Sequence, residues 1–138
     1  MKTFFSLLCL SFISMSFAQQ ISIIPKPVKT TVKTGNFTIT ENTVIIAEGE
    51  DEKKSAAFLN DYLEEFYGLK LPGYTKSKKP ALPYIRLSLN KTPNAIEGKY
   101  TMKISHSAID IIGNDAEGVF YGIQTLIQLL PAEKTANL

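Results

Sequence analysis

The sequence has very few of the residues on which most catalytic sites depend. It contains one histidine, one cysteine and no tryptophan among 138 residues. Cys9 lies in an N-terminal segment that we expect to be removed, so the mature chain would have no disulfide and no thiolate nucleophile. With His106 alone, histidine-rich zinc sites and Ser-His-Asp or Cys-His arrangements cannot be assembled. Because a Gly-rich phosphate loop is missing as well, we predict neither a metal nor a cofactor.

The sequence also has no large excess of charge of either sign. Lys2 belongs to the segment expected to be removed, which leaves fourteen of the fifteen basic side chains against thirteen acidic ones. Nucleic acids and anionic membranes attract proteins with a basic excess, so we expect neither as a partner. The mature chain of about 120 residues is long enough for one domain with a hydrophobic core.

Residues 1–18 have the pattern of a secretory signal peptide. Lys2 supplies the positive charge, residues 4–17 form the apolar region, and Ser16-Phe17-Ala18 presents small residues to a signal peptidase. We expect cleavage before Gln19 and export to the periplasm or the extracellular space. The apolar run is shorter than the roughly 20 residues that a membrane-spanning helix needs, so no membrane span is expected after cleavage.

Hydrophobic periodicity predicts a single mixed α/β domain with two helices packed on a sheet. Strands are expected at residues 21–24, 28–33, 37–40, 43–47, 69–71, 84–89, 100–104 and 108–112. Helices are expected at residues 52–67 and 114–130, and Gly68 is expected to end the first in a left-handed conformation. His106 falls in the turn of a hairpin formed by the last two strands.

The helix expected at residues 114–130 is nearly uncharged and has two interior glycines. Asn114 and Glu117 fit a capping box, Asp115 is a competing cap, and Pro131 ends the helix. One broad apolar stripe contains Val119, Phe120, Ile123, Leu126, Ile127 and Leu130. A stripe of small residues beside it contains Gly118, Gly122, Thr125 and Leu129. Because each glycine costs about 1 kcal/mol relative to alanine, we expect the glycine stripe to face a second close neighbour outside this domain.

Two groups of carboxylates are the remaining candidates for chemistry, because glycoside hydrolysis runs on a pair of them. One group introduces the first helix and comprises Glu48, Glu50, Asp51 and Glu52. The other lies on the wet face of that helix and comprises Asp61, Glu64 and Glu65. Neither has the apolar surroundings that would raise one carboxyl pKa above the other. We therefore predict no catalytic, substrate-binding or metal-binding residue.

Other polar features of the sequence have ordinary explanations. Lys76, Lys78 and Lys79 are predicted to lie in a solvated loop. Asn36-Phe37-Thr38 and Asn90-Lys91-Thr92 match the N-glycosylation triplet, which matters only in a host that glycosylates exported proteins.

Two stretches of the sequence resemble the N-terminal accessory domain of glycoside hydrolase family 20, found in secreted β-N-acetylhexosaminidases. They are Ile23-Ile24-Pro25-Lys26-Pro27 and the run from Glu117 to Leu126 with Gln128-Leu129-Leu130. The resemblance implies a zincin-like α/β domain without zinc, packed against a (β/α)8 barrel. In that barrel an Asp-Glu pair assists attack by the substrate's own N-acetyl group. None of those residues can be assigned here, because the chain stops before the barrel.

The resemblance makes residues 19–131 the accessory domain and residues 132–138 the start of a linker toward the missing barrel. We expect the domain to pack on that barrel and to meet glycan only through it. The resemblance thus makes the chain a part of a glycoside hydrolase, with the catalytic domain absent from it. Two alternatives stay open. One is a stand-alone secreted module that binds glycan or protein through Tyr74, Tyr84 or Tyr121. The other is the leading domain of a related glycosidase, an O-GlcNAc hydrolase or α-glucuronidase.

Overall fold

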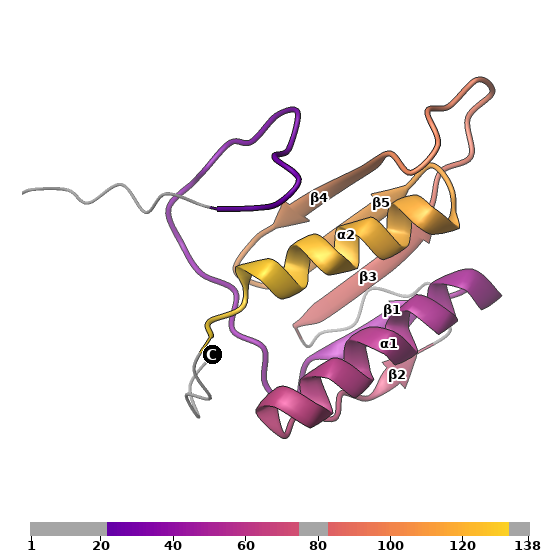
Figure 1. The fold of residues 1–138 in the computed structure, drawn as a ribbon. Coiled ribbons are helices and arrows are strands. Elements are labelled where there is room, and N and C mark those ends of the chain that lie inside the picture. The colour runs from indigo at the N-terminus through magenta and orange to yellow at the C-terminus, as the bar shows by residue number, and fades with distance from the viewer. Residues whose placement is uncertain (1–21, 75–82, 133–138) are drawn as a thin grey trace, which may run out of the picture.

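The protein folds as two layers, a mixed sheet and a pair of helices, as the sequence predicts (Figure 1). The computed structural model describes residues 22–74 and 83–132. Its elements are β1 (Val44–Ala47), α1 (Glu50–Tyr67), β2 (Gly73–Tyr74), β3 (Tyr84–Leu89), β4 (Tyr100–Ile104), β5 (Ala108–Gly113) and α2 (Ala116–Leu129). Within the described residues, no helix is long and apolar enough to cross a membrane.

The sheet has five strands in the order β2-β1-β3-β5-β4. Neighbours from β2 to β5 run parallel, and β4 pairs antiparallel with β5 as the predicted hairpin. The register aligns Ile85 with Ile45 on one side and Ile109 on the other. Because side chains alternate along a strand, these three isoleucines face the same side of the sheet, where they enter the main core.

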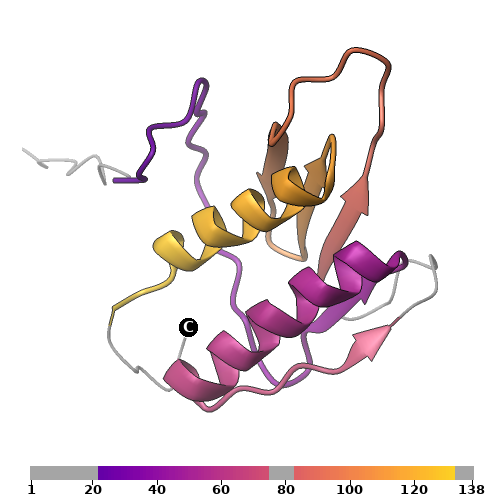
Figure 2. The same ribbon diagram turned by 45° about the vertical axis from the view of Figure 1, so that its right-hand side comes forward.

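Both helices cover that one face of the sheet and lie side by side (Figures 1 and 2). Leu59 and Leu63 of α1 are fully buried in the core beside Ile123 of α2. Gly68 ends α1 with a φ of 70°, and its N–H donates to the Glu64 carbonyl at 3.0 Å. The predicted left-handed stop is thus confirmed, because glycine adopts positive φ without a steric penalty.

The β-rich opening predicted from the sequence is wrong. Within residues 22–43 the structure contains no strand, and only the expected strand at 43–47 forms, as β1. The segment 28–33 has β-forming residues, but it pairs with no strand of the described sheet. The side chains of Val28 and Val32 are exposed. Ile39 is buried in the core and Phe37 packs against it, so the predicted alternation at 37–40 is correct for burial alone. Strand propensity does not supply a neighbouring strand.

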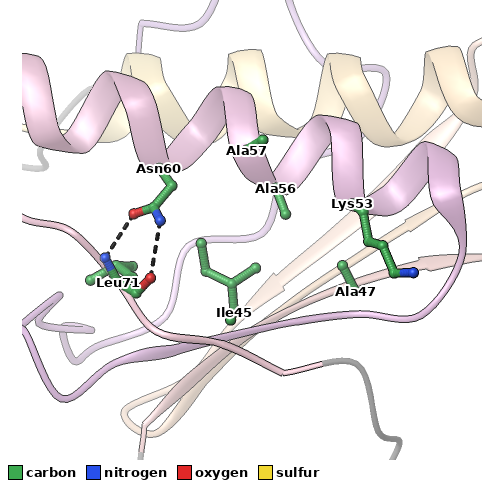
Figure 3. A pocket seen from close by; sticks show the side chains of 8 residues that line it. Ile45, Ala47, Lys53, Ala56, Ala57, Asn60 and Leu71 are labelled. Carbon is green, nitrogen blue, oxygen red and sulfur yellow. Dashed lines mark hydrogen bonds between the residues drawn. The ribbon is translucent and has the colours of Figure 1, made fainter.

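The short strand predicted at residues 69–71 is also displaced, and β2 begins at Gly73 instead. The side chain of Asn60 takes both backbone groups of Leu71: its Oδ1 accepts from the Leu71 N–H at 2.7 Å, and its Nδ2 donates to the Leu71 carbonyl at 3.0 Å (Figure 3). A side-chain amide therefore replaces a strand partner here, although the sequence places Asn60 among the polar residues of the helix.

Candidate functional site

The glycine stripe of α2 faces the domain's own sheet and loop. A Cβ added at Gly118 would collide with the Lys99 carbonyl, and one added at Gly122 would collide with Ile111 and crowd the Tyr100 ring. Thr125 continues the stripe, and its hydroxyl is 2.5 Å from the Tyr100 hydroxyl. The close neighbour inferred from the glycines exists, but it is internal. Our prediction that this stripe faces a partner outside the domain is therefore wrong.

The N-terminus of α2 is capped by Asp115, which confirms the competing cap and shows that the predicted Asn114–Glu117 capping box is wrong. One carboxylate oxygen of Asp115 accepts from the Gly118 N–H at 2.7 Å, and the other accepts from the Gly98 N–H at 2.8 Å. Asn114 instead donates through Nδ2 to the Ile96 carbonyl at 3.2 Å. The two residues join α2 to the loop between β3 and β4, which only the tertiary structure brings near.

The outward side of the helix pair carries large apolar side chains, which we name the aromatic face: Phe58, Tyr62, Phe66, Phe120 and Tyr121. Phe58 of α1 and Phe120 of α2 join the helices, with their ring centroids 5.2 Å apart. Tyr62 and Phe66 form a second pair at 4.5 Å. Phe58, Phe66 and Tyr121 have exposed fractions of 41%, 46% and 50%. Exposed apolar groups gathered on one side of a domain are typical of an interaction surface.

A groove of about 410 Å³ lies at the C-terminal end of the two helices. It is lined by Tyr62, Phe66, Tyr67, Ile127, Gln128, Leu130, Pro131 and Ala132. The Tyr67 hydroxyl donates to the Pro131 carbonyl at 2.5 Å, which ties the segment after α2 back to α1. Burial of this hydroxyl raises the pKa of Tyr67 above its usual value, and the nearby Tyr62 adds to the rise.

A smaller hollow of about 260 Å³ lies between α1 and the β1–β2 edge (Figure 3). Its wall is mostly small or aliphatic, with Ala56, Ala57 and Ile45 among the lining residues. The polar side chains in it are already engaged, because Asn60 holds Leu71 and the Lys53 ammonium donates to Glu50 at 2.6 Å. No polar groups converge on this hollow as they do in a ligand site.

Three of the seven candidate acids form exposed ion pairs at α1. Glu50 accepts from Lys53, and this hydrogen bond lowers the pKa of Glu50, to which the charge of Lys53 adds. Asp51 lies 3.6 Å from Lys54, and Glu64 lies 2.7 Å from Lys70.

Glu52 differs from its neighbours, because it is buried against the backbone of Gly49 at the start of the helix. The positions of Glu50, Asp51, Glu52 and Glu64 fit a structural role at the helix surface or at its N-terminus.

The remaining candidates are dispersed over the molecule. His106 lies exposed in the bend between β4 and β5, where its ring contacts Gly35. Tyr84 is only 5% exposed and stacks beneath Arg86, so it cannot serve as a binding platform. The three loop lysines lie outside the described residues. Among residues 22–74 and 83–132, no three His, Cys, Asp or Glu side chains are grouped to hold a metal.

A comparison with protein-family models identifies the family of this chain. The family model described as "Glycosyl hydrolase family 20, domain 2" matches residues 20–138. A β-hexosaminidase of Porphyromonas gingivalis is 34% identical over 113 residues, which are 82% of this chain and 14% of that protein.

Two solved structures have a similar fold. A GH20 exo-β-N-acetylglucosaminidase from Vibrio harveyi aligns with a TM-score of 0.62 and 26% identity, over 79% of this chain and 16% of that one. A GH20 β-N-acetylhexosaminidase from Streptomyces coelicolor A3(2) aligns with a TM-score of 0.60 and 29% identity, over 73% and 20%. The chain thus spans between 14% and 20% of the length of these three relatives.

Proposed function

The chain belongs to glycosyl hydrolase family 20 through its domain 2, and on this premise we propose that it is the non-catalytic accessory domain of an exported β-N-acetylhexosaminidase. The full-length enzyme would remove terminal N-acetylhexosamine residues, and the catalytic residues would belong to a barrel that follows Leu138. The chain spans only a small share of its relatives' length, which supports assigning catalysis to a separate domain. The finer description of the domain as zincin-like is part of the same proposal.

One observation carries the proposed role of the domain. A family 20 domain with a complete internal core leaves the aromatic face of α1 and α2 exposed. Burying apolar area gains about 25 cal/mol per Å², so covering several aromatic rings strongly favours contact with another apolar surface. We propose that the catalytic barrel covers this face and that the domain braces it. The aromatic face thereby replaces the glycine stripe as the docking surface.

The division of the chain is also proposed. Residues 1–18 would direct export and be removed before Gln19, residues 19–131 would form the accessory domain, and residues 132–138 would begin the linker. The N-terminal sequence of protein recovered from the periplasm or the medium tests this division. A mature protein that still begins at Met1, or one retained in the cytoplasm, would contradict the export proposal.

The activity is tested by extending the reading frame beyond the Leu138 codon to its stop codon and producing the full-length protein. We expect hydrolysis of a chromogenic N-acetyl-β-D-glucosaminide by the full-length protein and none by the chain of 138 residues at equal concentration. A stop codon directly after Leu138 would contradict the proposal, as would a folded full-length protein that leaves the substrate intact.

A further inference from the structure

We propose that residues 28–34 form a processing site, where an endopeptidase that cleaves after lysine cuts the folded domain. The site goes beyond the proposed function, because neither its recognition nor its cleavage involves a barrel. The sequence of the segment is Val-Lys-Thr-Thr-Val-Lys-Thr, so Lys29 and Lys33 are each followed by a threonine. A carboxylate in the specificity pocket of such enzymes selects a basic side chain.

The backbone of this segment is open to an enzyme. Every residue from 28 to 36 is exposed, with Val28 fully exposed and Val32 exposed by 66%. Among the described residues, no backbone group of residues 28–34 makes a hydrogen bond, and none belongs to a helix or strand. Valine and threonine favour an extended backbone. A partner that binds a peptide as an added strand needs such a chain, because it pairs with free N–H and C=O groups.

Two contacts hold the ends of the segment against the domain. Before it, the Gln128 side chain binds the backbone of Ile24: Oε1 accepts from the Ile24 N–H at 2.8 Å, and Nε2 donates to the Ile24 carbonyl at 2.9 Å. After it, Gly35 lies so close to His106 that an added Cβ would be 2.5 Å from the imidazole ring. The chain between these contacts projects away from the sheet and helices (Figures 1 and 2). A segment fixed at both ends loses less conformational entropy when an enzyme binds it.

The proposed cut is a hydrolysis. At the second lysine, the C–N bond between the Lys33 carbonyl carbon and the Thr34 nitrogen breaks. The hydroxyl of a water molecule joins the carbonyl carbon, and the remaining hydrogen of that water passes to the Thr34 nitrogen, which becomes the new N-terminal amine. The same balance holds for the bond that follows Lys29.

The cut separates a peptide from the domain without opening the hydrophobic core. Phe37 and Ile39 are the first described residues that pack in the core, and they lie after both bonds. Among the hydrogen bonds of the described residues, the two between Gln128 and Ile24 are the ones that would still hold residues 22–33. Processing therefore changes the N-terminus of the protein and leaves the sheet and both helices in place.

Three other lysines of the described chain lack one of these properties. The Lys54 side chain is 78% exposed, but its backbone is hydrogen-bonded within α1. Lys103 is also exposed, but β4 pairs with β5 at this position. Lys26 is followed by Pro27, whose ring restricts the backbone around the bond to be cut. Cleavage within a helix or strand requires local unfolding first, which lowers its rate.

The test digests the mature protein, produced up to its natural stop codon, with a limiting amount of lysyl endopeptidase. Lys76, Lys78 and Lys79 lie outside the described residues, so glutamine replaces them in every protein compared. The digestion is made once on the folded protein and once in urea, where every bond is accessible. Mass spectrometry of the new N-termini measures the rate of cleavage after each lysine.

We expect the folded protein to be cut after Lys29 or Lys33 at least about a hundredfold faster than after Lys54 or Lys103. The cut protein should keep a cooperative thermal unfolding transition, because its core is unchanged. Lys29→Gln combined with Lys33→Gln should remove these cuts, whereas the matched control Lys103→Gln should not.

Three results would overturn the proposal. They are cleavage after Lys54 or Lys103 at an equal rate, no cleavage after Lys29 and Lys33 in the folded protein although both are cut in urea, and loss of the cooperative transition on cleavage. Hydrolysis of the chromogenic substrate by the same preparation is measured in parallel. The proposed function depends on that activity and not on the cut, so the two failures are distinguishable.

Discussion

The inward face of the helix pair is apolar, whereas the outward face carries large aromatic side chains among charged and polar ones. The inward face combines fully buried residues such as Leu63 and Ile123 with glycines that admit the backbone of the same domain. The outward face carries Phe58, Phe66 and Tyr121, each exposed by between 41% and 50%. Small residues therefore mark packing within this domain, and large aromatic residues form the surface that we propose a partner covers.

The largest expected effect on stability comes from truncating the side chain of Leu63 on the inward face. Leu63 is fully buried and Phe66 is 46% exposed, although they lie one turn apart on α1. Leu63→Ala should lower the free energy of unfolding by about 2–5 kcal/mol, because it leaves a cavity in the core. Phe66→Ala removes more atoms from a surface position and should cost less than about 1 kcal/mol. Chemical denaturation of both variants measures the difference, and equal losses would erase the distinction between the faces.

A smaller loss is expected when a methyl group is added to the glycine stripe. Gly118→Ala gains about 1 kcal/mol of helix propensity but forces the new Cβ against the Lys99 carbonyl, an overpacking that costs about 1–3 kcal/mol. Urea denaturation should therefore show a net loss of stability. Gln124→Ala, at a partly exposed position of the same helix, is the control and should stay near the parent. A stabilised Gly118→Ala variant would show that the glycine is incidental.

The smallest effect on stability is expected on the outward face, where association should change instead. Serine and phenylalanine have similar helix propensities, so Phe58→Ser loses mainly its contact with Phe120, worth about 0.5–1.5 kcal/mol. We expect residues 19–138 to self-associate through the uncovered aromatic face, and Phe58→Ser to shift them toward monomer in sedimentation velocity. Ile112→Ser on the opposite sheet face should leave association unchanged. A parent chain that is monomeric at all concentrations would contradict the expectation.

The sequence predicted the regular elements well wherever local pattern and long-range contacts agree. The first helix was expected at 52–67 and forms at Glu50–Tyr67, and the strands at 84–89 and 100–104 form at those bounds. It failed where a partner decides the outcome. The segment 28–33 has strand residues without a strand beside it, and Asn60 on a polar helix face turns inward to Leu71.

The candidate site shows the same division. Phe66 and Phe120 have the helical spacing of core residues, yet they are 46% and 36% exposed because α1 and α2 meet the sheet through neighbouring stripes. The groove was not foreseen at all. Its signal in the sequence is weak, because Tyr67, Gln128 and Ile24 become a unit only through contacts across 64 and 104 residues.

By itself the sequence determined the fold class, the two helices, the hairpin and the scarcity of catalytic residue types. These follow from local periodicity and composition, which act within a few residues along the chain. The resemblance to family 20 is also a property of the sequence, and it rests on the two stretches within residues 23–27 and 117–130. Only the tertiary structure decided which stripe of α2 is inward, which residue caps it and where apolar surface is left over. Those outcomes depend on what lies opposite each side chain, and a helix carries the same apolar stripes whichever of them its neighbours cover.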